Sequence, residues 1–365
     1  MINKSYKIGS RETGCLIINL LTYKLFTGFP SVYPINGGTA AHLSALLSAA
    51  AAILIIYAIL RLYRRFDTDN IITAAERLFG GIGKYAAGAF LALYIAAAFV
   101  YSLREFSGLV KMLAFPTAPV WFVAAFFAAA VIFSSMRGIN SIIRAHTLVI
   151  PAAVAVTALM LASVLRYCEP ENLFPVLGNG LPKILCGVVR GIPMYSDITL
   201  IFLINPFAAD PYALKHTALR AAILAAVINL AFIIIYTMAI PFPVSAQADY
   251  PLYLLLKEVY YGRFFQRIDA VYMLTAALCG MLYLSFAASL LMYTLKQTFG
   301  MKSKRALPVP TAVALFLGAL DTSVFGTGGT YSLMLVLSCA APAALFAVAL
   351  GTLITDRGGR KNAKA

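Results

Sequence analysis

Arg-Gly-Ile-Pro-Met-Tyr-Ser-Asp, at residues 190–197, interrupts a hydrophobic span that runs roughly over 183–206. An earlier span, roughly over 12–33, is interrupted by Thr-Gly-Phe-Pro at residues 27–30. Proline removes a backbone donor and clashes with the preceding turn, and glycine frees the backbone, so both stretches predict broken helices. Inside a bilayer such backbone is tolerated only where it is buried in protein or lines a cavity. Matching breaks in the two halves of the chain therefore predict a small-molecule site between them.

The composition around these breaks is that of a membrane protein. The 365 residues are 61% hydrophobic and only 12% charged, with a mean hydropathy of +0.85, whereas soluble domains carry about 25% charged residues. A helix needs about 20 apolar residues to cross the hydrocarbon core. On that length the chain divides into about ten spans, which we place roughly at 12–33, 41–63, 84–110, 118–136, 145–166, 183–206, 215–241, 266–296, 307–325 and 331–354. A short interfacial helix is expected around Asp69 to Phe79.

Basic residues set the orientation of these spans. Of the 29 lysines and arginines, 20 fall on one side when loops are assigned alternately, 6 fall on the other, and 3 lie within spans. This bias predicts that both termini are cytoplasmic, and it explains the net charge of +15 without nucleic acid. The two halves, about 12–166 and 183–354, then begin in opposite orientations. We predict one all-α integral membrane domain over 1–365 that contains a five-plus-five inverted repeat with discontinuous helices 1 and 6.

Signatures of catalysis or metal binding are not found in the sequence. The five cysteines have no ligand-like spacing, and no HExxH, GxSxG, paired-glutamate or phosphate-loop motif occurs. No small-residue cleavage site follows the first apolar run, so we expect that run to stay in the mature protein. The sequence predicts a protein that is not an enzyme and that uses neither a metal nor another cofactor.

The first break supplies three candidate ligand-binding residues, Thr27, Gly28 and Phe29. The half-helix after the break would present free amides and a positive dipole end, which suit a carboxylate. The alternative is a proline kink that binds nothing. Lys24 lies one turn earlier, and an ammonium at this depth costs about 2.5–3.5 kcal/mol. It is expected to face the bundle interior, pair with a carboxylate or with carbonyls, and take the place of a coupling cation; the alternative is snorkelling to the interface.

The second break supplies further candidates. Arg190 and Asp197 flank it and are interpreted as a pair that closes over it, and Gly191, Met194, Tyr195 and Ser196 are interpreted as lining the pocket. The adjacent Arg104 and Glu105 cannot face each other on one helix, so each is expected to meet a partner on another helix or to lie near the outer interface. Tyr101 and Thr275 are further candidates for the pocket, and the alternative for Tyr101 is plain packing with a satisfied hydroxyl.

Ile8 to Glu12, followed by a long apolar run to Pro30, opens a series of short segments that includes Gly-Gly-Thr-Ala-Ala at 37–41 and Leu-Arg-Glu-Phe at 103–106. Read in order, these segments resemble the spore germinant-receptor B-subunit family (GerAB/GerKB-like permeases) of the amino acid/polyamine/organocation superfamily. Glu12 stands where that family has glutamine, and His42 where tryptophan is common. The resemblance covers nearly the whole chain, and its segments lie at 8–30, 37–41, 61–66, 75–80, 103–106, 115–119, 138–144, 172–175 and 267–269.

The resemblance implies a LeuT-like fold and a function. The function is that of a permease-like subunit of a nutrient germinant receptor in the inner spore membrane, acting with an A-type subunit and a C-type lipoprotein subunit. A small nutrient, such as an amino acid, would bind in the midplane pocket and trigger germination. Two alternatives remain open from the residues alone: a proton-coupled amino acid transporter, and a membrane scaffold with a vestigial pocket.

Overall fold

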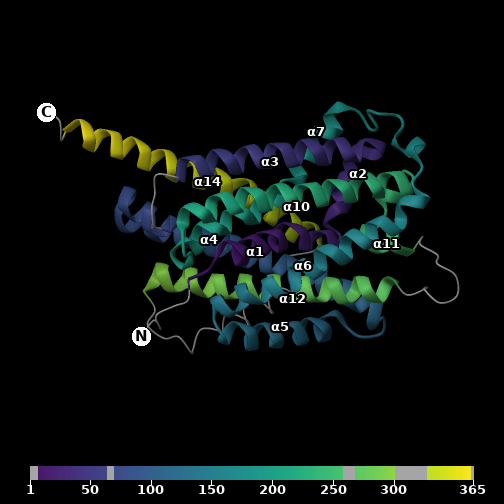
Figure 1. Ribbon diagram of the computed structural model, residues 1–365, viewed down its shortest axis with the longest axis horizontal. Helices are drawn as coiled ribbons and strands as arrows, with labels where there is room; N and C mark the ends of the chain where they lie inside the picture. Colours follow the sequence, from purple (N-terminus) through teal and green to yellow (C-terminus); the bar gives the residue numbers. More distant parts are fainter. Residues whose placement is uncertain (1–6, 64–69, 258–267, 301–326, 363–365) are drawn as a thin grey trace.

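The computed structural model describes residues 7–63, 70–257, 268–300 and 327–362. These residues are helical or lie in connections, apart from one isolated parallel bridge between Ile8 and Ala208. The predicted ninth span, 307–325, lies outside the described residues, as does Arg267 of the 267–269 segment. In Figure 1 the helices run along the long axis with both termini at the left end, whereas α2, α7 and α11 lie towards the right end.

The first predicted span is discontinuous. It consists of α1 (Ser10–Thr22), η1 (Tyr23–Phe26), η2 (Phe29–Ser31) and α2 (Val32–Gly37). The backbone leaves the helical region at Thr27, where φ is −103° and ψ is −177°. Its hydroxyl donates to the Lys24 carbonyl oxygen at 2.7 Å and accepts the Phe29 amide at 3.3 Å. The threonine side chain thus satisfies backbone groups that the break sets free, as buried polar groups require.

The sixth predicted span is also divided, but more gently. It consists of α7 (Leu181–Gly191), α8 (Pro193–Ser196), η6 (Asp197–Leu200), α9 (Ile201–Ile204) and η7 (Asn205–Phe207). Ile192 keeps helical dihedrals, with φ −52° and ψ −42°. The discontinuity expected at 190–197 is therefore present, but the backbone at Ile192 stays helical. Proline ends one helical segment here, and the chain tightens into 3₁₀ turns without becoming extended.

The remaining spans are long helices: α3 (Ala41–Tyr63), α4 (Ile71–Ala114), α5 (Val120–Met136), α6 (Ile139–Val164), α10 (Pro211–Ala239), α12 (Ile268–Phe299) and α14 (Thr327–Asn362). Shorter elements connect them: η3 (Gly38–Ala40), η4 (Leu165–Tyr167), η5 (Pro170–Leu173), η8 (Val244–Ala246) and α11 (Pro251–Lys257). Within α4, Gly80 has φ +62°, a value that favours glycine, so the helix turns sharply there. The segment from Ile71 up to this turn is the short helix expected around Asp69 to Phe79.

Most long helices in the part of the chain that the structure describes have the length and apolar character of membrane spans. Seven helical segments there are long and apolar enough to cross a bilayer, and α5 is a shorter apolar helix. Within the segment 181–207, 78% of the residues in its 18-residue apolar window are buried inside the bundle. The corresponding share for the segment 139–167 is 28%. The divided sixth span is therefore central, whereas α6 exposes large apolar side chains such as Leu148 and Leu159. This arrangement brings the divided helices into the middle of the protein.

Candidate functional site

Lys24 and Asp197 form an ion pair at the centre of the bundle. The Lys24 Nζ atom lies 2.8 Å from Asp197 Oδ2, and both side chains are 0% exposed. The ammonium also donates to the Pro193 carbonyl oxygen and lies 5.9 Å from the centroid of the Tyr23 ring. The pairing predicted for Lys24 is therefore present. It joins η1 of the first divided helix to α8 and η6 of the sixth.

Two tyrosines complete the surroundings of the Asp197 carboxylate. The Tyr94 hydroxyl of α4 donates to Oδ1 at 2.5 Å, and the Tyr283 hydroxyl of α12 donates to Oδ2 at 3.1 Å. The Ser196 hydroxyl lies 2.9 Å from that of Tyr94, and the Tyr23 ring stacks on that of Tyr283 with centroids 3.7 Å apart. A buried charge is tolerated only when it is paired and hydrogen-bonded, and Asp197 meets both conditions. We call these side chains (Lys24, Ser196, Asp197, Tyr94 and Tyr283) the central network.

A chamber of about 600 Å³ opens at the end of the bundle that the basic residues predict to face outward. Its volume lies in the range typical of sites for small molecules. It is walled by α2, α4, α7, α14 and the loop before α11, and its lining residues are Gly28, Phe29, Ser31, Val32, Ile35, Asn36, Tyr101, Glu105, Arg190, Ala246, Gln247, Ala248, Asp249, Tyr250 and Tyr331.

The chamber reaches the first break at Gly28. The Gly28 amide donates to Glu105 Oε2 of α4 at 3.0 Å. A Cβ atom on residue 28 would stand 2.5 Å from the Asp249 carbonyl oxygen and 3.0 Å from Glu105 Oε2. Glycine is therefore required by close approach, since φ at Gly28 is an ordinary −70°. Glu105, expected to meet another helix or to lie near the outer interface, thus contacts the backbone of the first break.

Aromatic side chains form much of the chamber wall. The Tyr331 ring lies 6.1 Å from that of Phe29 and 6.5 Å from that of Tyr101, measured between centroids. The Tyr331 hydroxyl donates to the Arg190 carbonyl oxygen at 3.0 Å. The Tyr250 hydroxyl donates to the Glu105 carbonyl oxygen at 3.2 Å, and burial together with the nearby Glu105 and Asp249 charges raises the pKa of Tyr250. Tyr250 therefore stays a neutral hydrogen-bond donor at physiological pH.

Residues 10–323 match the model of a family described as spore germination protein. The chain belongs to this family of spore germination proteins. A relative, spore germination protein KB of Bacillus subtilis (strain 168), is 23% identical over 292 residues, which are 79% of this chain and 77% of the relative.

Solved transporters share the fold of this spore germination family member. Mhp1, a nucleobase-cation-symport-1 family transporter, in a closed conformation with bromovinylhydantoin bound, has a TM-score of 0.67 at 14% identity, over 93% of this chain and 77% of Mhp1. MhsT in complex with L-phenylalanine has a TM-score of 0.58 at 18% identity, over 93% of this chain and 89% of MhsT. These likenesses confirm the LeuT-like fold, and at such low identities they carry the fold alone.

The predicted site residues of this family member fall into two groups. Gly28, Phe29, Tyr101, Glu105 and Arg190 line the chamber. Lys24, Ser196 and Asp197 belong to the central network, and Thr27, Met194 and Tyr195 are buried beside them in the divided helices. The structure therefore divides into two places what the sequence treated as one pocket.

Four predictions need correction or stay open. The proposed Arg190–Asp197 pair is wrong, because Asp197 is buried against Lys24 whereas Arg190 is exposed on the chamber wall. Gly191 packs tightly, since a Cβ atom there would lie 2.7 Å from the Tyr33 ring and 2.8 Å from the Ser48 hydroxyl. The Thr275 hydroxyl donates to the Val271 carbonyl oxygen within α12. Arg104 is half-buried on α4 and makes contacts of its own. Whether any of these residues binds a ligand remains a prediction.

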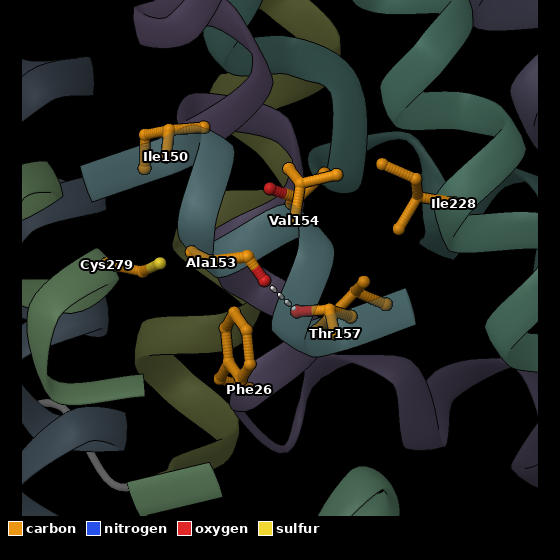
Figure 2. Close-up of a pocket in the computed structure, with 9 residues that line it drawn as sticks. Phe26, Ile150, Ala153, Val154, Thr157, Ile228 and Cys279 are labelled. Carbon is orange, nitrogen blue, oxygen red and sulfur yellow. Dashed lines mark hydrogen bonds between the residues drawn. The ribbon is translucent and has the colours of Figure 1, made fainter. Parts of the chain in front are cut away.

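A second cavity lies on the N-terminal side of the first break, among α1, η1, α6, α10 and α12. Figure 2 shows Phe26, Ile150, Val154, Ile228 and Cys279 around it, with the Thr157 hydroxyl donating to the Ala153 carbonyl oxygen at 2.8 Å. Its volume is about 10 Å³, about the space that one water molecule needs. A nutrient could enter it only if the surrounding helices moved apart.

Sequence reasoning missed several residues of both groups. Tyr283, Tyr250, Tyr331 and Asp249 carry no local motif, because each is a tyrosine or an acid in a helix or loop of ordinary composition. Only the fold brings them to the divided helices. Among the described residues, no group of three or more His, Cys, Asp or Glu side chains could hold a metal ion.

Proposed function

We propose that this chain is the permease-like subunit of a spore nutrient germinant receptor and that it binds a small nutrient, such as an amino acid, next to the first helix break. The observation that carries the proposal is the chamber of about 600 Å³ that ends on Gly28 and Phe29. Ligand sites in helical membrane transporters lie beside such breaks. Membership of the spore germination family supplies the physiological setting.

The central network offers a route from binding to a response. The chamber is lined by Phe29 of the first divided helix and Arg190 of the sixth, and the Lys24–Asp197 pair ties the same two helices together. A nutrient that holds the two helices in one arrangement better than in another shifts the equilibrium by that difference in affinity. Partner subunits would then respond to the favoured arrangement.

The proposal includes the setting that the sequence predicts. The chain would lie in the inner spore membrane with both termini cytoplasmic and would act with an A-type subunit and a C-type lipoprotein subunit. It would bind its nutrient without catalysing a reaction on it. Co-purification of the three subunits from spore membranes would test the partners, and cysteine labelling at Ile35 and Glu76 from either side would test the orientation.

Ligand-dependent stabilisation of the full-length protein tests nutrient binding. The protein in nanodiscs is heated with a panel of amino acids, sugars and nucleosides, and its melting temperature is recorded. Binding of any panel member supports the proposal, since a ligand at 100 times its Kd stabilises by about 2.7 kcal/mol. A panel that produces no shift contradicts it.

A matched pair of variants locates the binding. Ile35→Trp adds bulk on the chamber wall, where Ile35 is 50% exposed, and Ile55→Trp adds the same bulk on α3, where Ile55 is 40% exposed and is not a chamber residue. We expect Ile35→Trp to remove the nutrient-dependent shift and the germination response, and Ile55→Trp to keep both. A full response in Ile35→Trp spores would instead support the scaffold with a vestigial chamber.

A proton-coupled transporter is the second candidate. The fold is shared with a cation symporter, and the buried Lys24 ammonium would take the place of a coupling cation between the divided helices. Proteoliposomes that contain the protein would then accumulate a radiolabelled amino acid when a pH gradient is imposed, without added sodium. Binding without accumulation would favour the receptor.

A further inference from the structure

We infer that the chamber recognises its ligand through an ammonium group, which pairs with Glu105, and that a carboxylate on the same ligand faces Arg190. This inference rests on the proposed function, namely that the chamber binds a small nutrient. It adds the charge of the group that is recognised and the direction in which the ligand lies.

The first step concerns the backbone amide at the break. In transporters with broken helices, freed amides at a half-helix start commonly bind the anionic group of the substrate. Here Glu105 Oε2 already accepts the Gly28 amide at 3.0 Å. A ligand carboxylate at this place would have to displace the protein's own carboxylate, and it would be repelled by that like charge. The Glu105 side chain therefore already occupies the position at which a ligand carboxylate would be expected.

The second step concerns the free side of Glu105. Among the described residues, its other oxygen, Oε1, has no hydrogen-bond partner, and Glu105 lines the chamber. Phe29, Tyr101 and Tyr331 also line the chamber, with rings close to one another, and aromatic faces attract a cation within about 6 Å. Asp249 adds a second negative charge to the wall. A carboxylate oxygen beside aromatic rings suits an ammonium group.

The third step concerns the opposite charge. Of the described residues that line the chamber, Arg190 is the one cation, and it stands on α7, whereas Glu105 stands on α4. A guanidinium binds a carboxylate with two parallel hydrogen bonds. A free amino acid would therefore lie with its ammonium towards the first break and its carboxylate towards Arg190. This direction is the reverse of a carboxylate bound at the break.

Two matched series of probes test the inference on the full-length protein in nanodiscs. One series is L-alanine, ethylamine and propanoate, and the other is L-phenylalanine, 2-phenylethylamine and 3-phenylpropanoate. We expect that in at least one series the amino acid binds most tightly, the amine binds more weakly, and the carboxylate without an ammonium does not bind. Affinities are measured by calorimetry or by shifts of the melting temperature.

Variants assign the two ends of the ligand. Glu105→Gln keeps an oxygen that can accept the Gly28 amide, and we expect it to weaken the amino acid and the amine about tenfold or more, as loss of a charge-assisted contact does. Arg190→Gln should weaken the amino acid towards the level of the amine and leave the amine unchanged. Glu76→Gln removes a charge outside the chamber and should leave every probe unchanged. The melting temperature without ligand checks that each variant folds.

The outcomes separate this inference from the function on which it rests. Propanoate or 3-phenylpropanoate binding as well as the matching amine overturns the inference and leaves nutrient binding intact. Binding of only a sugar or a nucleoside from the wider panel does the same. Failure of every compound to bind overturns both. If Glu105→Gln does not fold, the order of the probes on the unmodified protein still decides the matter.

Discussion

The two helix breaks of this protein are stabilised in opposite ways. At the first, the chain is extended at Thr27 and an amide is set free, and a carboxylate from α4 accepts that amide. At the second, the chain keeps helical dihedrals but Pro193 lacks an amide, and the Pro193 carbonyl oxygen accepts hydrogen bonds from the Lys24 ammonium and from the Ser196 hydroxyl. The Glu105 carboxylate thus accepts the free amide at the first break, and the Lys24 ammonium donates to the free carbonyl oxygen at the second.

Glu105 at the first break and the Lys24–Asp197 pair at the second also differ in how far a ligand can reach them. Glu105 lines an open chamber, so one of its oxygens remains available. Lys24 and Asp197 are 0% exposed, and the described residues around them satisfy both charges. We therefore propose the first break as the place where a ligand binds, whereas at the second break the Lys24–Asp197 pair joins the two divided helices. Substitutions at each break should accordingly change different properties.

The largest effect is expected from separating the central ion pair. Lys24→Met leaves the Asp197 carboxylate buried without its cation, and Asp197→Asn leaves the ammonium without its anion. Removing one partner of a buried pair costs about 3–5 kcal/mol of stability. Each single variant should unfold at much lower temperature or denaturant concentration than the parent protein, as followed by circular dichroism in detergent.

The double variant Lys24→Met/Asp197→Asn is the control for this prediction. Because no buried charge is left, its loss of stability should be smaller than the sum of the two single losses. Additive losses would show that the two side chains do not depend on each other. A Lys24→Met protein with unchanged stability and an unchanged nutrient response would remove Lys24 from any role in fastening the helices.

The next largest effect is expected from the tyrosine hydroxyls on Asp197. Tyr94→Phe removes a donor 2.5 Å from Oδ1, and Tyr283→Phe removes one 3.1 Å from Oδ2. A hydrogen bond to a charged group contributes about 1.5–3 kcal/mol, and the shorter bond should lie at the upper end. We expect Tyr94→Phe to lower the free energy of unfolding more than Tyr283→Phe does. The reverse order would mean that Oδ2, which also pairs with Lys24, depends more on its hydroxyl donor than Oδ1 does.

A smaller effect is expected from filling the space at the first break. In Gly28→Ala the new methyl group would meet the Asp249 carbonyl oxygen, so the loop before α11 must shift. Overpacking of this kind costs about 1–3 kcal/mol. Gly81→Ala is the matched control, because no atom lies within 4 Å of the added methyl group. Calorimetric unfolding should show a loss for Gly28→Ala and none for Gly81→Ala.

The Gly28→Ala variant should also change the response to nutrient. Because Gly28 and Asp249 both line the chamber, a shifted loop changes the chamber itself. We expect a weaker nutrient-dependent shift in Gly28→Ala even at temperatures where the variant is fully folded. An unaltered shift would place the binding site away from the first break.

The sequence predicted the breaks well because proline and glycine act on their own local backbone. The Thr-Gly-Phe-Pro stretch at 27–30 does divide its helix, and Pro193 does end a helical segment. The burial of Lys24 followed equally from local facts, since a cation 12 residues into an apolar span must face protein. The helical dihedrals at Ile192 did not follow, because proline suits the helix that it begins but disfavours the helical region for the residue before it.

The partners of these residues could not be predicted in the same way. Arg190 and Asp197 are seven residues apart, which made them a plausible pair, but Lys24 lies closer to Asp197 once the two divided helices are packed together. Glu105 and Gly28 are 77 positions apart in the chain, and Tyr94 and Asp197 are 103 apart. Contacts over such separations depend on helix packing, which no single-sequence pattern records.

The smallest effect is expected from the partly exposed ion pair of Glu12 and Arg144, which tests whether burial is what makes the central pair costly to break. Glu12 of α1 lies 3.3 Å from Arg144 of α6, with the side chains 22% and 47% exposed. Exposed pairs of this kind contribute about 0–1 kcal/mol. Glu12→Gln keeps an acceptor for the Gly9 amide, now 2.8 Å from Glu12 Oε2, so that the start of α1 should remain capped. We expect a small loss that shrinks at high ionic strength, because salt screens exposed charges. A loss as large as that of Lys24→Met would mean that position along the first helix, and not burial, sets the cost of breaking the Lys24–Asp197 pair.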